Sequence, residues 1–123
     1  MGYYTNYNMT VRKVRDKAQF EDLYVELKHR DLIGYAFEEG SYNDKRHEAF
    51  FGSYDSAKWY RHAEDMVMIA EKFPNMYFEL EGAGEEFGDF WREYYHDMDV
   101  ETCRGDIIYE EPKKIQWKDL IPF

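Results

Sequence analysis

Carboxylates and aromatic rings alternate in residues 76–101, which makes this segment the best candidate in the chain for binding a cationic partner. It holds nine acids and one base, so it accounts for −8 of the formal net charge of −10. Tyrosine suits such a surface because its ring packs while its hydroxyl stays hydrated. The candidate partner-binding residues are therefore the acids Glu79, Glu81, Glu85, Glu86, Asp89 and Glu93 and the tyrosines Tyr77, Tyr94 and Tyr95.

Two interpretations of these acids stay open. Carboxylates on alternate residues of a strand lie roughly 6.5–7 Å apart, close to the phosphate spacing of a nucleic-acid strand, so they can mimic nucleic acid. The alternative is a solvated sheet face that only prevents edge-to-edge aggregation. An all-oxygen cluster also suits Ca²⁺ or Mg²⁺, but the segment lacks the regularly spaced aspartates of a calcium loop, so we expect no metal.

Residue types that carry catalysis are sparse. Cys103 is the one cysteine and has no histidine near it in sequence, whereas a nucleophilic thiol needs a base and a lowered pKa. The four histidines are scattered singly, without a His-x-x-x-His pair. Residues 82–84, Gly-Ala-Gly, precede two glutamates and are typical of a turn rather than a phosphate loop. We therefore expect no catalytic residue, no cofactor and no enzymatic activity.

The length, charge and cysteine count of the chain limit the class of partner and the cellular compartment that we expect. A length of 123 residues predicts one α+β domain over 1–123, with 112–123 as a C-terminal tail. A pI of about 4.8 argues against nucleic acid and anionic membranes as direct partners and favours a basic protein surface. A single cysteine and an N-terminus without a secretion signal are typical of a cytoplasmic protein.

The elements that must position these side chains follow from periodicity. Alternating residues predict strands at 3–14, 33–37, 47–53, 76–81, 87–95 and 100–109. Helical spacing predicts helices at 17–31, capped by Asp16, and from Asp55 or Ser56 to Phe73. The order is a ferredoxin-like βαββαβ core with two helices on one face. A C-terminal β-hairpin is expected to extend the antiparallel sheet beside the fourth strand.

The same patterns predict the core and the faces of the acidic hairpin. We expect one group of helical residues against the sheet: Phe20, Leu23, Leu27, Trp59, Ala63, Met66, Val67 and Phe73. In the hairpin, period-two alternation places Tyr77, Glu79 and Glu81 on the face opposite Met76, Phe78 and Leu80. Glu93 joins the first set only if the strand register allows it.

The sequence also resembles a group of known proteins, and this resemblance implies an origin for the chain. The layout that carries the resemblance is Tyr3-Tyr4-Thr5, Trp59, Glu64-Asp65-Met66, Lys72-Phe73-Pro74, Phe78-Glu79-Leu80-Glu81-Gly82, Gly84-Glu85-Glu86, Gly88-Asp89 and Trp91. This layout resembles small phage and prophage proteins and is similar in plan to YubB-type ferredoxin-like domains. The clearest match covers residues 55–110. The resemblance implies a mobile-element origin and a cytoplasmic host target, and small acidic phage proteins often inhibit host defence. It brings no catalytic residues.

We therefore expect a non-enzymatic acidic binding protein, a phage inhibitor of a host nucleic-acid-handling defence enzyme of the anti-CRISPR or anti-restriction type. Its partner would be a host protein with a basic surface, such as a nuclease, contacted through the acidic hairpin. One alternative is a housekeeping or self-associating phage protein, for which a homodimer stays open. A third is a small metal-dependent enzyme.

Overall fold

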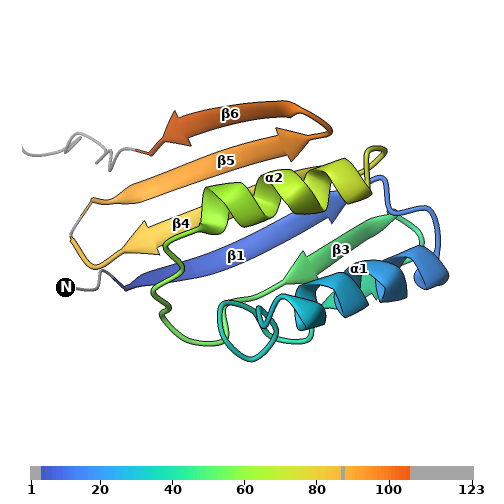
Figure 1. The fold of residues 1–123 in the computed structure, drawn as a ribbon, viewed down its shortest axis with the longest axis horizontal. Helices are drawn as coiled ribbons and strands as arrows, with labels where there is room; N and C mark the ends of the chain where they lie inside the picture. Colours follow the sequence, from blue (N-terminus) through green and yellow to red (C-terminus); the bar gives the residue numbers. More distant parts are fainter. Residues whose placement is uncertain (1–3, 87, 106–123) are drawn as a thin grey trace, which may run out of the picture.

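The fold is α+β, with two helices and one open antiparallel sheet of six strands in the part of the chain that the computed structural model describes, residues 4–86 and 88–105. The strands lie in the order β2-β3-β1-β4-β5-β6, and both helices cover the same face of the sheet (Figure 1). The elements are β1 (Thr5–Arg12), α1 (Lys17–His29), β2 (Ser41–Asn43), β3 (Glu48–Phe51), α2 (His62–Lys72), β4 (Tyr77–Gly84), β5 (Phe90–His96) and β6 (Asp99–Arg104).

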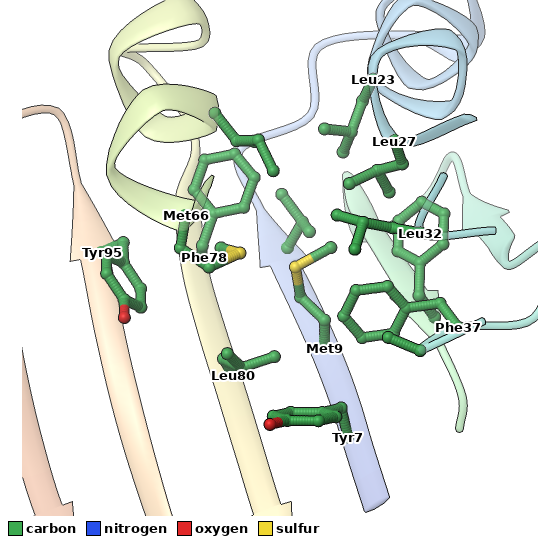
Figure 2. Close-up of a cluster of buried hydrophobic side chains, with 14 of the residues drawn as sticks. Tyr7, Met9, Leu23, Leu27, Leu32, Phe37, Met66, Phe78, Leu80 and Tyr95 are labelled. Carbon is green, nitrogen blue, oxygen red and sulfur yellow. The ribbon is translucent and has the colours of Figure 1, made fainter. Parts of the chain in front are cut away.

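The central strand β1 behaves as its alternation predicts. Its inward residues are buried, and Met9 pairs with Phe51 of β3 on one side and Leu80 of β4 on the other. Figure 2 shows side chains of β1, β4 and β5 pointing to the helix side, toward Met66 of α2 and the leucines of α1. Fully burying one large apolar side chain stabilises the fold by about 1.5–3 kcal/mol. The side chains between the sheet and the helices therefore contribute most of the stability.

Helix α1 confirms its predicted start and its apolar stripe. The carboxylate of Asp16 accepts a hydrogen bond from the Gln19 N–H at 2.9 Å, which satisfies one free amide at the helix start. Leu23 and Leu27 are fully buried, four residues apart on one face. The helix ends two residues earlier than expected, and Asp31 just beyond it has a left-handed φ of 59°.

The prediction for α2 is wrong at its start. The helix begins at His62, so Trp59 enters the core from the preceding loop and cannot set the phase of the helical stripe. The inward face consists of Met66, Ile69 and Ala70, while Ala63 is exposed rather than buried. Phe20, Val67 and Phe73 pack against the core but are only partly buried. Neither α1 nor α2 is long and apolar enough to cross a membrane, and the described residues contain no other helix.

The expected strand at 33–37 is also wrong. The Leu32 carbonyl accepts hydrogen bonds from three successive N–H groups, at residues 35–37, and Gly34 has a φ of 81°, so this segment is a tight turn. The second strand is β2, which lies between the segments 33–37 and 47–53 that were expected to be strands. There the Tyr42 hydroxyl donates to the Val14 carbonyl at 3.1 Å and its ring stacks on Phe20. Tertiary packing therefore decides which segment pairs with β3.

The acidic hairpin forms, but its turn lies later in the chain than expected. Strand β4 continues through residues 82–84, so the prediction of a turn there is wrong, and the connection to β5 begins at Glu85. The pairing of β5 with β4 and of β6 with β5 confirms that the additional strands extend the sheet beside the fourth strand. The expected end of the last strand at Tyr109 and the tail at 112–123 lie outside the described residues.

Candidate functional site

The helix-free face of the sheet is the candidate site. Three strands contribute alternate residues to this open face: β4 (77, 79, 81), β5 (90, 92, 94, 96) and β6 (99, 101, 103). The residues between them point to the opposite side of the sheet, where the helices pack on β4 and β5 but leave β6 exposed. On β1 the open-face residues are Asn6, Asn8, Thr10 and Arg12. The face is wide because β5 and β6 extend the sheet beyond α2 (Figure 1).

Strand register groups the open-face side chains into rows that cross the sheet. One row is Thr10, Glu79, Tyr94 and Glu101, each opposite the next on the neighbouring strand. The next row is Asn8, Glu81, Arg92 and Cys103. The first row thus places one carboxylate on each side of a tyrosine, and the second places an arginine beside a glutamate.

Arginines neutralise part of the negative charge. Arg92 Nε donates to Glu81 Oε2 at 3.2 Å, and that hydrogen bond, followed by smaller effects of Tyr94 and Glu79, raises the pKa of the guanidinium above its usual value. On β1, Arg12 lies 3.5 Å from Glu48 of β3. Within the described residues, neither Glu79 nor Glu101 is in an ion pair. Glu101 therefore carries charge that the described residues leave unpaired, and so does Glu79 apart from its weaker attraction to Arg92.

Two hollows lie on the open face, with Tyr94 lining both. The first hollow, of about 430 Å³, is lined by residues that include Asn8, Glu81, Phe90, Arg92 and Cys103. The second hollow, of about 490 Å³, has a more apolar lining that includes Tyr77, Glu79, His96, Asp99 and Glu101. A hollow with an apolar wall and a few polar groups is the usual form of a binding site for a side chain or small ligand.

Aromatic rings supply most of the apolar surface of this face. The Tyr77 ring stacks on His96 with centroids 3.7 Å apart and planes within 6°, and His96 Nδ1 lies 3.0 Å from the Met76 carbonyl oxygen. Because a carbonyl oxygen only accepts, His96 Nδ1 is the donor there. Tyr77 is 48% exposed and Phe90 is 44% exposed. Exposed, braced aromatic rings of this kind are frequent anchors of protein interfaces.

The structure divides the predicted site residues into three groups. Tyr77, Glu79, Glu81 and Tyr94 share the open face. Glu85, Glu86 and Asp89 lie in the β4–β5 connection, where Glu85 accepts a hydrogen bond from the Tyr4 N–H and Asp89 lies 3.4 Å from Arg104.

The third group, Glu93 and Tyr95, lies on the opposite side of the sheet, so neither can contribute to an open-face interface. Register pairs Glu93 with Leu80, and Tyr95 is only 1% exposed. Glu93 Oε1 accepts hydrogen bonds from the Tyr95 hydroxyl at 2.7 Å and from His62 Nε2 at 2.9 Å. The grouping of these two residues with the acidic surface is therefore corrected by the register.

This inward network is what the sequence interpretation missed. Burial disfavours the Glu93 carboxylate, but the hydrogen bonds from His62 and Tyr95 outweigh burial and hold its pKa below the usual value. Burial, together with the Glu93 carboxylate, raises the pKa of the Tyr95 hydroxyl. The signal was the alternation of β5: a glutamate between Trp91 and Tyr95 on one inward face needs a partner.

Groups able to carry catalysis lie at two separate places in the described part of the chain, the His62–Glu93 pair on the helix side of the sheet and Cys103 on the open face. Cys103 is exposed on the open face, opposite Arg92. No three His, Cys, Asp or Glu side chains among residues 4–86 and 88–105 gather where they could hold a metal ion.

Comparisons with known proteins found no matching family model, no matching curated protein and no matching solved structure.

Proposed function

We propose that this chain is a non-enzymatic binding protein that engages a basic surface of another protein through the open face of its sheet. The observation that carries the proposal is the row Glu79, Tyr94, Glu101, which lies on a helix-free face beside two hollows. Aromatic anchors bordered by carboxylates match a surface rich in lysine and arginine. The carboxylates would speed the encounter, and the rings would hold the complex.

We propose a ferredoxin-like core for the first four strands and the two helices, with β5 and β6 as an addition. The chain order βαββαβ and the spatial order β4-β1-β3-β2 support this assignment. The addition lies beside β4, which would otherwise be an edge of that core. It widens the open face and contributes Tyr94 and Glu101, so the binding surface depends on it.

The partner class that we propose is a host nucleic-acid-handling defence enzyme, with this chain as a phage-encoded inhibitor acting in the host cytoplasm. The resemblance to phage proteins supports the origin, and the charge supports the kind of surface. Along β4, Glu79 and Glu81 are two residues apart, roughly 6.5–7 Å, as phosphates are on one strand of nucleic acid. Such a surface would compete with nucleic acid for a basic groove.

The test begins with a pull-down from host lysate, followed by binding kinetics of the captured protein at low and high salt. The variant is Glu79→Lys/Glu101→Lys, which reverses the two acids of the row. We expect at least a roughly tenfold slower association at low salt and a smaller effect at high salt, because salt screens steering. The matched control is Glu21→Lys/Asp22→Lys, which makes the same charge change at exposed positions of α1.

Unchanged binding by a Glu79→Lys/Glu101→Lys variant that still unfolds cooperatively would overturn the proposal. The acids would then be a solvated face, and a housekeeping role would replace inhibition. Self-association, the other alternative, would appear as a concentration-dependent mass in sedimentation equilibrium of the purified chain. Substrate turnover by the purified protein that stops on metal removal and returns on metal addition would instead favour the small metal-dependent enzyme.

A further inference from the structure

The second hollow has the shape and charge to hold one extended cationic side chain. Its wall is aromatic, formed by Tyr94 and by the stacked pair of Tyr77 and His96. Carboxylates of Glu79, Asp99 and Glu101 line the same hollow. An apolar wall next to carboxylates suits a group that has an aliphatic stem and a charged, planar head.

The row across the sheet fixes where the charges lie. Glu79 and Glu101 are each directly opposite Tyr94, on the two neighbouring strands. Neighbouring strands are about 4.8 Å apart, so the two acids flank the tyrosine at about 5 Å on each side. A planar cation lying over the Tyr94 ring would therefore have a carboxylate available at each edge.

The chain already holds one arginine near Tyr94, two residues earlier on β5. In the first hollow, Arg92 donates to Glu81, and Tyr94 lines the same hollow. The first hollow thus holds an arginine head that is paired with a glutamate, with this tyrosine in its wall. Glu79 and Glu101 flank Tyr94 across the strands, and neither forms an ion pair with an arginine of the described residues, although Glu79 acts on Arg92 electrostatically.

We propose that the second hollow receives an arginine side chain of the partner, with the guanidinium on Tyr94 between Glu79 and Glu101. This inference rests on the proposed function and names the anchor of that interface. Arginine fits better than lysine because its weakly hydrated planar head stacks on rings and donates from both edges. At the far end of the hollow lie Arg12, paired with Glu48, and Lys13. Those charges confine the cation to the Tyr94 end.

The experiment uses three capped tripeptides with arginine, citrulline or lysine at the centre, titrated into the full chain and followed by two-dimensional amide NMR. Citrulline keeps the shape of arginine but has no charge. We expect saturable shifts from the arginine peptide at residues of β4, β5 and β6 around Tyr94. The lysine peptide should bind several-fold more weakly, and the citrulline peptide should cause no saturable shifts.

Variants then assign the contacts. Glu79→Gln/Glu101→Gln should weaken arginine-peptide binding at least tenfold, and Tyr94→Leu should abolish the preference for arginine over lysine. The matched control, Glu21→Gln/Asp22→Gln on α1, should leave binding unchanged. Equal shifts from arginine and citrulline peptides would overturn the inference, as would shifts centred away from the second hollow.

The outcome is separable from that of the proposed function. If Glu79→Lys/Glu101→Lys blocks the captured partner while the free arginine peptide does not bind at Tyr94, the interface stands and the arginine anchor fails. If the arginine peptide binds at Tyr94 and the captured partner is insensitive to both double variants, the second hollow binds arginine but the proposed function is wrong.

Discussion

Trp91 on β5 lies directly opposite Gly82 on β4, and its indole fills the space in which a side chain at position 82 would lie. A Cβ atom built on Gly82 would be 2.1 Å from Trp91 Cζ2. The indole continues over the strand to meet Tyr7 of β1, with centroids 6.0 Å apart, and His62 of α2, at 5.2 Å. The glycine therefore lets β5 pack against the core and supports the register that places Tyr94 between two acids.

We expect Gly82→Ala to destabilise the protein by about 1–3 kcal/mol, because the indole must move out of a packed position. The measurement is the free energy of unfolding by urea. Gly52→Ala is the matched control, since the nearest atom to a Cβ there is 3.4 Å away, in ordinary contact. Equal stabilities of Gly82→Ala and Gly52→Ala would contradict the close packing of Trp91 on β4.

Period-two alternation is enough to predict the part of the open face that β4 contributes. It placed Tyr77, Glu79 and Glu81 together because strand neighbours face opposite sides whatever the rest of the fold does. The same rule separates Tyr94 from Tyr95, so the two could not have shared a surface in a regular strand. The side that holds Glu93 depended on the register with β4, which only tertiary structure determines.

Other errors have equally local causes. Glycine marks either a turn or a close approach, and only the indole on the opposite strand shows that Gly82 is the second case. The alternation at 33–37 was real but short, and Gly34 with its positive φ closes a turn there. Helix α2 was predicted too long because Trp59 fits a helical phase while lying outside the helix. Each pattern was compatible with two structures, and contacts distant in sequence chose between them.

The Glu93 network predicts a dependence of stability on pH. Glu93→Gln should destabilise the protein by about 1–2 kcal/mol near neutrality. The Tyr95 hydroxyl and the His62 ring would each lose the charged acceptor of their hydrogen bond. The pKa of Glu93 is lowered by folding, so its contribution is present above its ordinary value of 4.5 and is lost as the pH falls through the lower, folded value. The difference between the two proteins should therefore shrink in acid.

Urea unfolding of both proteins across the acid range measures this difference. Glu21→Gln is the control, since that side chain is exposed on α1, and it should follow the wild type at every pH. A stability difference that stayed constant below the ordinary pKa would show that the amide is disruptive for reasons of shape rather than charge.

The cap of α1 offers a second test of stability. Asp16→Ala should cost about 1 kcal/mol, because the Gln19 N–H loses its acceptor at the start of the helix. Asp16→Asn should retain nearly all of the stability, since asparagine caps as well as aspartate does. The midpoint of urea unfolding compares the two variants, and an Asn variant as unstable as the Ala variant would mean that the charge, not the hydrogen bond, matters.

Cys103 decides between the proposed binding protein and an enzyme or redox protein. The thiol is exposed on β6, beside Arg92 and lining the first hollow. A serine in its place keeps the size and polarity of an exposed strand residue, so Cys103→Ser should change stability by less than about 0.5 kcal/mol. It should also leave the affinity for the captured partner unchanged. The measurements are urea unfolding and binding kinetics, and a Cys103→Ser variant that is folded but inactive would show that the thiol takes part in the function.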